Sequence, residues 1–134
     1  MLSNPGVSCL VISSSEPAHV DEYLHASGTQ LTSADRRVLA RYDDLIAGTY
    51  CHPHCGACLS TCVASLPIDD VLRYRMYAED YGAPDEARRK YARLAGADAA
   101  QCIGCPAPCA GACPYGVPIQ TSMLAAHTTL TTLA

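Results

Sequence analysis

Two runs of cysteine are the residues of this chain whose types and spacing could do chemistry. The downstream run places four cysteines within twelve residues and comprises Cys102, Cys105, Cys109 and Cys113. The upstream run has almost the same spacing and comprises Cys51, Cys55, Cys58 and Cys62. Glycine and alanine fill many of the gaps, as a chain wrapped tightly around an inorganic cluster requires, and thiolates are ligands of iron and zinc. Each run therefore predicts a metal site.

The spacing also predicts how the cysteines divide between two [4Fe–4S] clusters. Each iron of a cubane cluster takes one thiolate, so three close cysteines cover three corners and a distant one supplies the fourth, as in two-cluster bacterial ferredoxins. We expect one cluster to be bound by Cys51, Cys55, Cys58 and Cys113. We expect the other to be bound by Cys102, Cys105, Cys109 and Cys62. The spacings are looser than in the standard ferredoxin run, and Val63 stands where a proline is usual.

Several alternatives stay open at these runs. Structural zinc also binds cysteine, although zinc sites usually pair two C-x2-C knuckles, and a cluster that lacks one iron is a further alternative. His52 and His54 lie inside the first run, where an imidazole could ligate either metal but more often faces solvent or forms hydrogen bonds. Cys9 lies far from both runs and is interpreted as a small buried hydrophobic residue.

Charge and hydropathy exclude two classes of partner. The formal net charge is −4 and no broad basic stripe is present, so we expect no binding to nucleic acid. The basic residues 88–90 follow Asp85 and Glu86 at helical spacing, which favours a solvated helix face with ion pairs over a docking patch for an acidic partner. The most apolar stretch is too short to cross a membrane, so we expect no membrane insertion.

The cysteines also indicate a compartment. Nine cysteines without a secretory signal are typical of a reducing environment, in which thiols remain free for metal. We therefore expect a cytoplasmic protein without a disulfide framework.

Periodicity predicts a mainly α fold. Residues 7–12 are the exception, because a short run of branched apolar residues between turn signals predicts a buried strand. Apolar spacing, helix caps, prolines and glycines predict helices between Ser15 and Gly28, between Thr32 and Gly48, from Pro67 to Gly82, from Pro84 to Gly96, and onward from Pro118. The two cysteine runs are thus separated by helices.

The runs and the helices between them resemble the α-helical ferredoxins, the module of the iron–sulfur subunits of succinate dehydrogenase and related electron-transfer proteins. This resemblance covers residues 50–119. The phrases LSNPGV, EPAHVDEYL, DVLRYRMY and CPYGVP, at residues 2–7, 16–24, 70–77 and 113–118, resemble the C-terminal region of aldo/keto reductases that carry an appended iron–sulfur domain. The resemblance implies a docking or remnant segment over residues 1–48, which would contain the last strand and helix of a (β/α)8 barrel. It implies a di-cluster α-helical ferredoxin-like domain over residues 49–134.

The same resemblance bears on catalysis. The family keeps its catalytic tyrosine, lysine, aspartate and histidine upstream of this region, so we do not expect the chain to be catalytic alone. Its nucleotide-binding positions fall on Ser13, Ser14, His19 and Tyr23, where only one serine matches and the cationic groups are absent. NADP binding by this chain is therefore doubtful.

Three functions follow as expectations. The first is an electron-transfer protein or module that relays single electrons between its clusters and a redox partner protein. The second is a small subunit or truncated C-terminal part of an aldo/keto reductase-like oxidoreductase, in which another chain supplies the barrel. The third is a zinc-stabilised interaction protein without redox activity. The predicted strand, if uncovered, also favours an oligomer or a hetero-complex.

Overall fold

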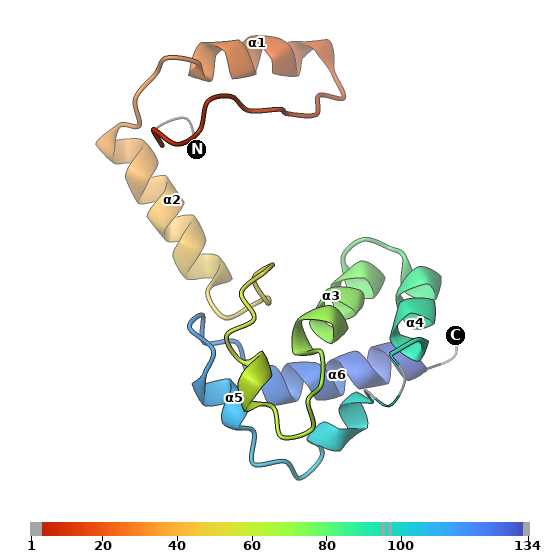
Figure 1. The fold of residues 1–134 in the computed structure, drawn as a ribbon. Helices are drawn as coiled ribbons and strands as arrows, with labels where there is room; N and C mark the ends of the chain where they lie inside the picture. Colours follow the sequence, from red (N-terminus) through yellow and green to blue (C-terminus); the bar gives the residue numbers. More distant parts are fainter. Residues whose placement is uncertain (1–3, 95, 97, 133–134) are drawn as a thin grey trace. The chain divides into compact units, whose positions relative to one another are not determined.

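A computed structural model describes residues 4–94, 96 and 98–132. Every regular element within these residues is helical, which confirms the mainly α prediction (Figure 1). The chain divides into two compact units, Met1–Leu45 and Ile46–Ala134. All eight cysteines of the two runs belong to the second unit.

The first unit contains α1 (Pro17–Ala26) and most of α2 (Ser33–Ile46). Both helices were expected, and α1 ends just before Gly28, whose φ of 76° ends a helix readily. The predicted strand at residues 7–12 is wrong, because this segment has no regular structure. A strand needs a partner for its backbone hydrogen bonds, and the described residues contain no other strand. None of the described residues of this unit is buried.

Helix α2 begins with a reciprocal cap. The Thr32 hydroxyl accepts a hydrogen bond from the Asp35 backbone N–H at 3.2 Å, and the Asp35 carboxylate accepts one from the Thr32 backbone N–H at 2.8 Å. The hydrogen bonds from Thr32 lower the pKa of Asp35. The exchange satisfies two N–H groups that the helix itself leaves unpaired, as a capping box does.

The second unit is built from three longer helices, α3 (Ile68–Glu79), α4 (Pro84–Ala92) and α6 (Ile119–Thr131). Helix α3 packs against both α4 and α6, and α4 also contacts α6 (Figure 1). On α4, Arg88 lies 3.5 Å from Asp85 and Lys90 lies 3.5 Å from Glu86, which confirms the predicted ion-paired face.

The core lies where these helices meet the cysteine runs. Met123 and Ala126 of α6 and Val71 of α3 are fully buried, as the apolar periodicity predicts. Three cysteines, Cys58, Cys102 and Cys109, belong to the same buried cluster. The core of this unit is therefore continuous with its cysteine runs.

Short helices carry the runs themselves. A 3-10 helix, η1 (Leu59–Thr61), lies inside the first run, and η2 (Ala99–Cys102) leads into the second, which also contains α5 (Pro108–Gly111). Helix α6 contacts η2 and α5, and α5 contacts η1. The two runs therefore contact each other through α5 and η1.

None of the helices described here has the length and apolar character needed to cross a membrane.

Candidate metal centres

The two cysteine runs share a backbone pattern that their spacing alone does not reveal. Each run places a residue with positive φ immediately before its second cysteine, two residues before its third, and three residues after its fourth. In the first run these residues are His54, Gly56 and Ser65, and in the second run they are Gly104, Ala107 and Gly116. Their φ values lie between 51° and 71°. Three of the six are not glycine, so this conformation could not be predicted from residue type.

The pattern continues into the helix that follows each run. Leu66 and Ile68 at the start of α3 correspond to Val117 and Ile119 at the start of α6, and all four side chains are buried. Pro67 and Pro118 have nearly the same backbone angles, φ −76° and ψ 75° against φ −74° and ψ 73°. The unit thus contains two copies of one arrangement, a cysteine run that turns into a helix.

The first cavity is lined by four cysteines taken from both runs. These cysteines are Cys51, Cys55 and Cys58 of the first run and Cys113 at the end of the second. The lining also includes the carboxylate of Asp69 and the apolar side chains of Ile68, Leu72, Val117 and Ile119. This grouping of cysteines is the one predicted for the first cluster.

The second cavity has the complementary composition. It is lined by Cys102, Cys105 and Cys109 of the second run and by Cys62 at the end of the first. Leu66, Ile68, Ile119 and Met123 form apolar walls, and Gln101 and Gln120 supply uncharged amides. All eight cysteines of the two runs are thereby accounted for, four in each cavity.

The two cavities share one wall. Ile68 and Ile119 line both of them, and each is at most 2% exposed. These isoleucines are the first residues of α3 and α6, so the helix starts stand between the two groups of cysteines. The cavities are therefore neighbours within a single core.

The thiols of these cavities are held in a poorly solvated environment. Burial, followed by the nearby Cys51 and Cys113, raises the pKa of Cys58 to about 11. Burial, followed by neighbouring thiols of the second cavity, raises the pKa of Cys102 and of Cys109. Burial, then the Asp69 carboxylate, raises the pKa of Cys51. Desolvated thiols become good ligands only when a cation compensates their charge, as a metal does.

Two backbone N–H groups point at cysteine sulfurs. Leu66 N–H donates to Cys62 Sγ at 3.3 Å, and Ala107 N–H donates to Cys105 Sγ at 3.4 Å. Both donors belong to segments with positive φ, which bring the amide toward the sulfur. Hydrogen bonds of this kind tune the properties of sulfur-ligated metals.

Gln120 ties α6 to the loop of the second run. Its amide nitrogen donates to the carbonyl oxygens of Cys102 and Cys105, at 2.8 Å in each case. One side chain therefore fixes the first two cysteines of that run from the start of the helix. Sequence reasoning missed this residue, because a lone glutamine carries no motif.

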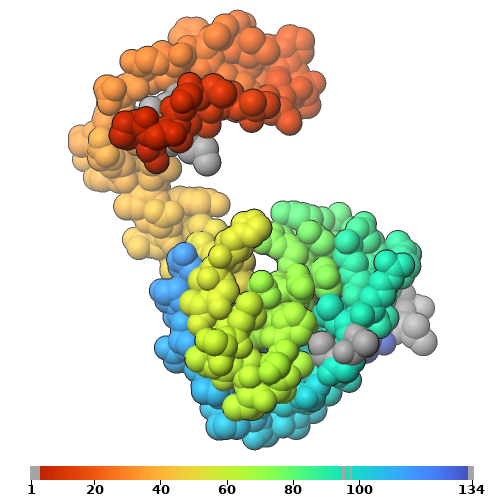
Figure 2. Space-filling view, viewed as in Figure 1, coloured from red at the N-terminus to blue at the C-terminus, as the bar shows by residue number. Residues whose placement is uncertain are grey.

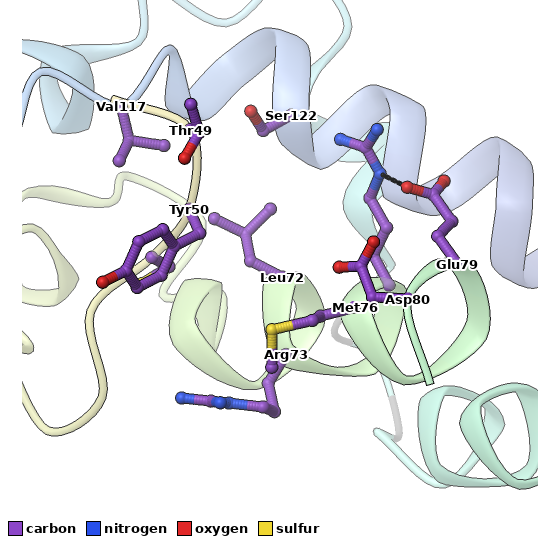
Figure 3. Close-up of a pocket in the computed structure, with 11 residues that line it drawn as sticks. Thr49, Tyr50, Leu72, Arg73, Met76, Glu79, Asp80, Val117 and Ser122 are labelled. Carbon is purple, nitrogen blue, oxygen red and sulfur yellow. Dashed lines mark hydrogen bonds and ion pairs between the residues drawn. The ribbon is translucent and has the colours of Figure 1, made fainter. Parts of the chain in front are cut away.

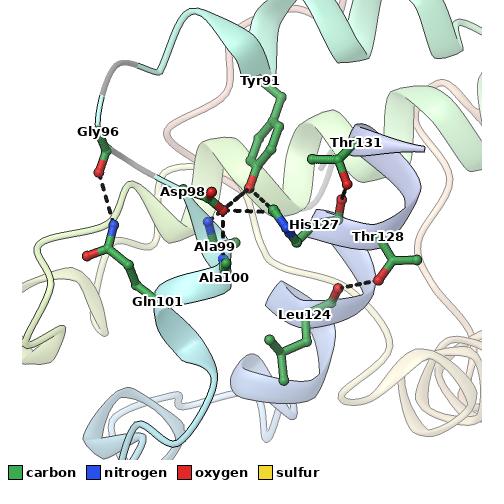
Figure 4. A network of polar contacts seen from close by, with 10 residues as sticks. All are labelled: Tyr91, Gly96, Asp98, Ala99, Ala100, Gln101, Leu124, His127, Thr128 and Thr131. Carbon is green, nitrogen blue, oxygen red and sulfur yellow. Dashed lines mark hydrogen bonds and ion pairs between the residues drawn. The ribbon is translucent and has the colours of Figure 1, made fainter. Parts of the chain in front are cut away.

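The segment before the second run is fixed by a polar network (Figure 4). The Tyr91 hydroxyl accepts a hydrogen bond from the buried Ala99 N–H at 2.9 Å, and it lies 2.9 Å from His127 Nδ1 and 3.4 Å from Asp98 Oδ1. Asp98 also caps η2 by accepting from Ala100 N–H at 2.8 Å. The network joins α4, η2 and α6 directly upstream of Cys102.

His52 is packed in an aromatic stack. Its ring lies 3.7 Å from the ring of Tyr115 and 4.6 Å from that of Tyr50, measured between centroids. His52 follows Cys51 and Tyr115 follows Pro114, so the stack joins the start of the first run to the end of the second. His54 is exposed and has a φ of 59°. No group of three or more His, Cys, Asp or Glu side chains in the described part is arranged around a single metal ion.

Two surface hollows adjoin the first cavity. One is lined by Thr49, Tyr50 and Cys51 together with side chains of α3 and α6 (Figure 3). Its lining includes Arg75 and Glu79, which form an ion pair at 2.8 Å. The other lies between residues 51–54 and α3, and Figure 2 shows it between the yellow and green segments. Both include Cys51 and Arg73. Both hollows therefore share Cys51 with the lining of the first cavity.

The prediction that Cys9 is buried is wrong. Cys9 is exposed and not buried, because the segment that carries it forms no strand and the described residues contain no sheet to cover it. Cys9 also lies in the first unit, away from both cavities in the chain.

Comparison of the chain with protein-family models, with curated proteins and with solved structures returned no match. The resemblances to α-helical ferredoxins and to aldo/keto reductases remain predictions.

Proposed function

We propose that this chain binds two [4Fe–4S] clusters and relays single electrons to or from a redox partner protein. The observation that carries the proposal is the pair of neighbouring cavities, each lined by three cysteines of one run and one of the other. A cubane cluster takes four thiolates, so the donor set of each cavity matches the cluster in number and kind. When bound, such clusters supply one-electron oxidation and reduction.

The protein's own contribution is to hold and desolvate these ligands. Apolar side chains enclose the cysteines, and N–H groups of Leu66 and Ala107 approach two of the sulfurs. The cavities share the wall formed by Ile68 and Ile119, which supports electron exchange between two sites over a short path. Ligation would be Cys51, Cys55, Cys58 and Cys113 at one site and Cys102, Cys105, Cys109 and Cys62 at the other.

The doubled arrangement of run and helix supports the further proposal that residues 46–134 form an α-helical ferredoxin-like domain. The helical connection between the runs, through α3 and α4, agrees with that fold class. A ferredoxin-like role requires no substrate pocket in this chain, and electrons would pass to a partner at the surface.

Metal and sulfide analysis tests the proposal directly. Anaerobically purified chain should be brown, should contain iron and acid-labile sulfide in equal amounts, and should absorb broadly near ~400 nm with bleaching on reduction. A colourless protein that contains stoichiometric zinc and no sulfide would support the zinc-stabilised alternative and reject the relay.

Double variants test the division of the cysteines. Cys55→Ala with Cys113→Ala removes two ligands of one proposed site, so dithionite-reduced protein should keep the EPR signal of one intact [4Fe–4S] cluster. Cys105→Ala with Cys113→Ala removes one ligand from each site, so no site retains four cysteines and that signal should be lost. Cys9→Ala is the control and should keep the wild-type signal. The reverse result for the two double variants would show that each run binds its own cluster.

A second candidate function is a subunit or C-terminal part of an aldo/keto reductase-like oxidoreductase. The observation that favours it is the first unit, in which α1 and α2 contain no buried residue while Val38 and Leu45 are each 69% exposed. Affinity purification should then recover a barrel protein whose reductase activity depends on this chain. A chain that remains monomeric in its native lysate would argue against this candidate.

A further inference from the structure

Asp69 and Gln120 occupy equivalent positions in the two copies of the run-and-helix arrangement. Each is the second residue of its helix, directly after the buried Ile68 or Ile119. Each lines the cavity beside its own helix start, Asp69 the first and Gln120 the second. Because the two positions are equivalent, the first cavity has an aspartate where the second has a glutamine.

That difference is one of charge. Among the described residues that line the second cavity there is no Asp, Glu, Lys, Arg or His. The first cavity has the Asp69 carboxylate, and its other titratable lining residue besides cysteine and tyrosine is His52. A carboxylate in a partly buried site acts through a lower dielectric constant than water, so its charge is felt by the sulfurs around it.

The two side chains also differ in what they can bind. Gln120 uses its N–H groups to hold the carbonyl oxygens of Cys102 and Cys105. An ionised aspartate has no N–H or O–H to donate, so Asp69 cannot form the equivalent clamp. Asp69 lines the first cavity together with Cys51, whereas Arg73 is not among the residues that line it. Asp69 therefore places a negative charge at the first cavity that has no counterpart at the second.

We propose that Asp69 lowers the reduction potential of the first cluster below that of the second, so that an electron entering the pair rests at the second site. The inference rests on the proposed function. One electron would leave the first cluster, which is oxidised, and enter the second, which is reduced, with no atom transferred. The electron would come from an external one-electron donor, and the added negative charge of a reduced cluster is disfavoured beside a carboxylate.

The test is a redox titration followed by EPR on the full-length chain. It is made in the Cys62→Ala background, in which only the first site keeps four cysteines. Asp69→Asn should raise the reduction potential of that site. At a fixed ambient potential, the ratio of reduced to oxidised cluster should increase roughly tenfold, which corresponds to about 59 mV for one electron. Asp70→Asn is the matched control, because Asp70 carries the same charge on the next residue but does not line the first cavity. It should leave the potential nearly unchanged.

Gln120→Glu provides the converse test. Measured in the Cys113→Ala background, it places a carboxylate at the second site and should lower the potential of that site. If Asp69→Asn fails to retain its cluster, Gln120→Glu still tests whether a carboxylate at this helix position lowers the reduction potential. Unchanged potentials in both variants, or equal shifts for Asp69→Asn and Asp70→Asn, would overturn the inference while leaving two bound clusters. Absence of iron and sulfide from the wild-type chain would overturn the proposed function as well.

Discussion

Replacing Tyr91 by phenylalanine tests how the segment before the second cysteine run is held. The side chain is 8% exposed, and its hydroxyl is the acceptor for the backbone N–H of Ala99, a residue that is fully buried. Phenylalanine fills nearly the same volume, so the change removes the hydroxyl and leaves the Ala99 N–H without that partner. An unpaired buried donor costs about 1–3 kcal/mol. For a domain of this size class, that loss corresponds to a fall in Tm of roughly 5–20 °C.

The assay compares thermal unfolding of the anaerobic wild-type chain and Tyr91→Phe by circular dichroism at one scan rate. Amide hydrogen exchange adds a local measurement, because the Ala99 amide should lose protection while the amides of α3 keep theirs. Tyr81→Phe is the matched control, since Tyr81 is 65% exposed and its substitution should change stability by less than about 0.5 kcal/mol. A Tyr91→Phe chain with wild-type Tm and a protected Ala99 amide would refute the reasoning.

Two further predictions concern pH and the backbone. The metal-free, reduced chain should lose stability as pH rises from the ordinary thiol pKa of 9.0 toward about 11, because burial raises the pKa of Cys58 and the folded state therefore favours its protonated form. Thermal melts between neutral and alkaline pH measure this loss, and a flat profile would contradict it. Ser65→Gly should raise stability by up to about 1 kcal/mol and Gly116→Ser should lower it by about as much, because both positions have positive φ. Denaturant unfolding of the pair checks this, and equal effects of the same sign would contradict it.

Helix positions were largely predictable from the sequence because periodicity, proline and glycine all indicated the same boundaries. Helix α6 begins directly after Pro118 and buries Ile119, Met123 and Leu130, as its spacing predicts. The strand predicted at residues 7–12 does not form. Apolar β-branched residues favour a strand only when a second strand supplies backbone hydrogen bonds, and one short segment contains no information about its partner.

The candidate site was predictable in its cysteines and not in its surroundings. The repeated spacing indicates all eight cysteines as candidate ligands. The grouping predicted from that spacing matches the cysteines that line each cavity. The clamp from Gln120 and the contact between Tyr91 and His127 join residues far apart in sequence, 36 residues in the second case. Such contacts depend on how helices pack, which local pattern does not specify. Ser65 and Ala107 adopt positive φ, a conformation that their residue types disfavour and that local sequence therefore does not predict.

The exchange of one cysteine between the runs has a consequence for the order of assembly. Filling the first cavity would fix Cys113, and with it the end of the segment that carries Cys102, Cys105 and Cys109. Part of the conformational entropy lost at the second cavity would then already have been lost at the first. Loading should therefore be positively cooperative, with few molecules holding a single cluster even when iron is limiting.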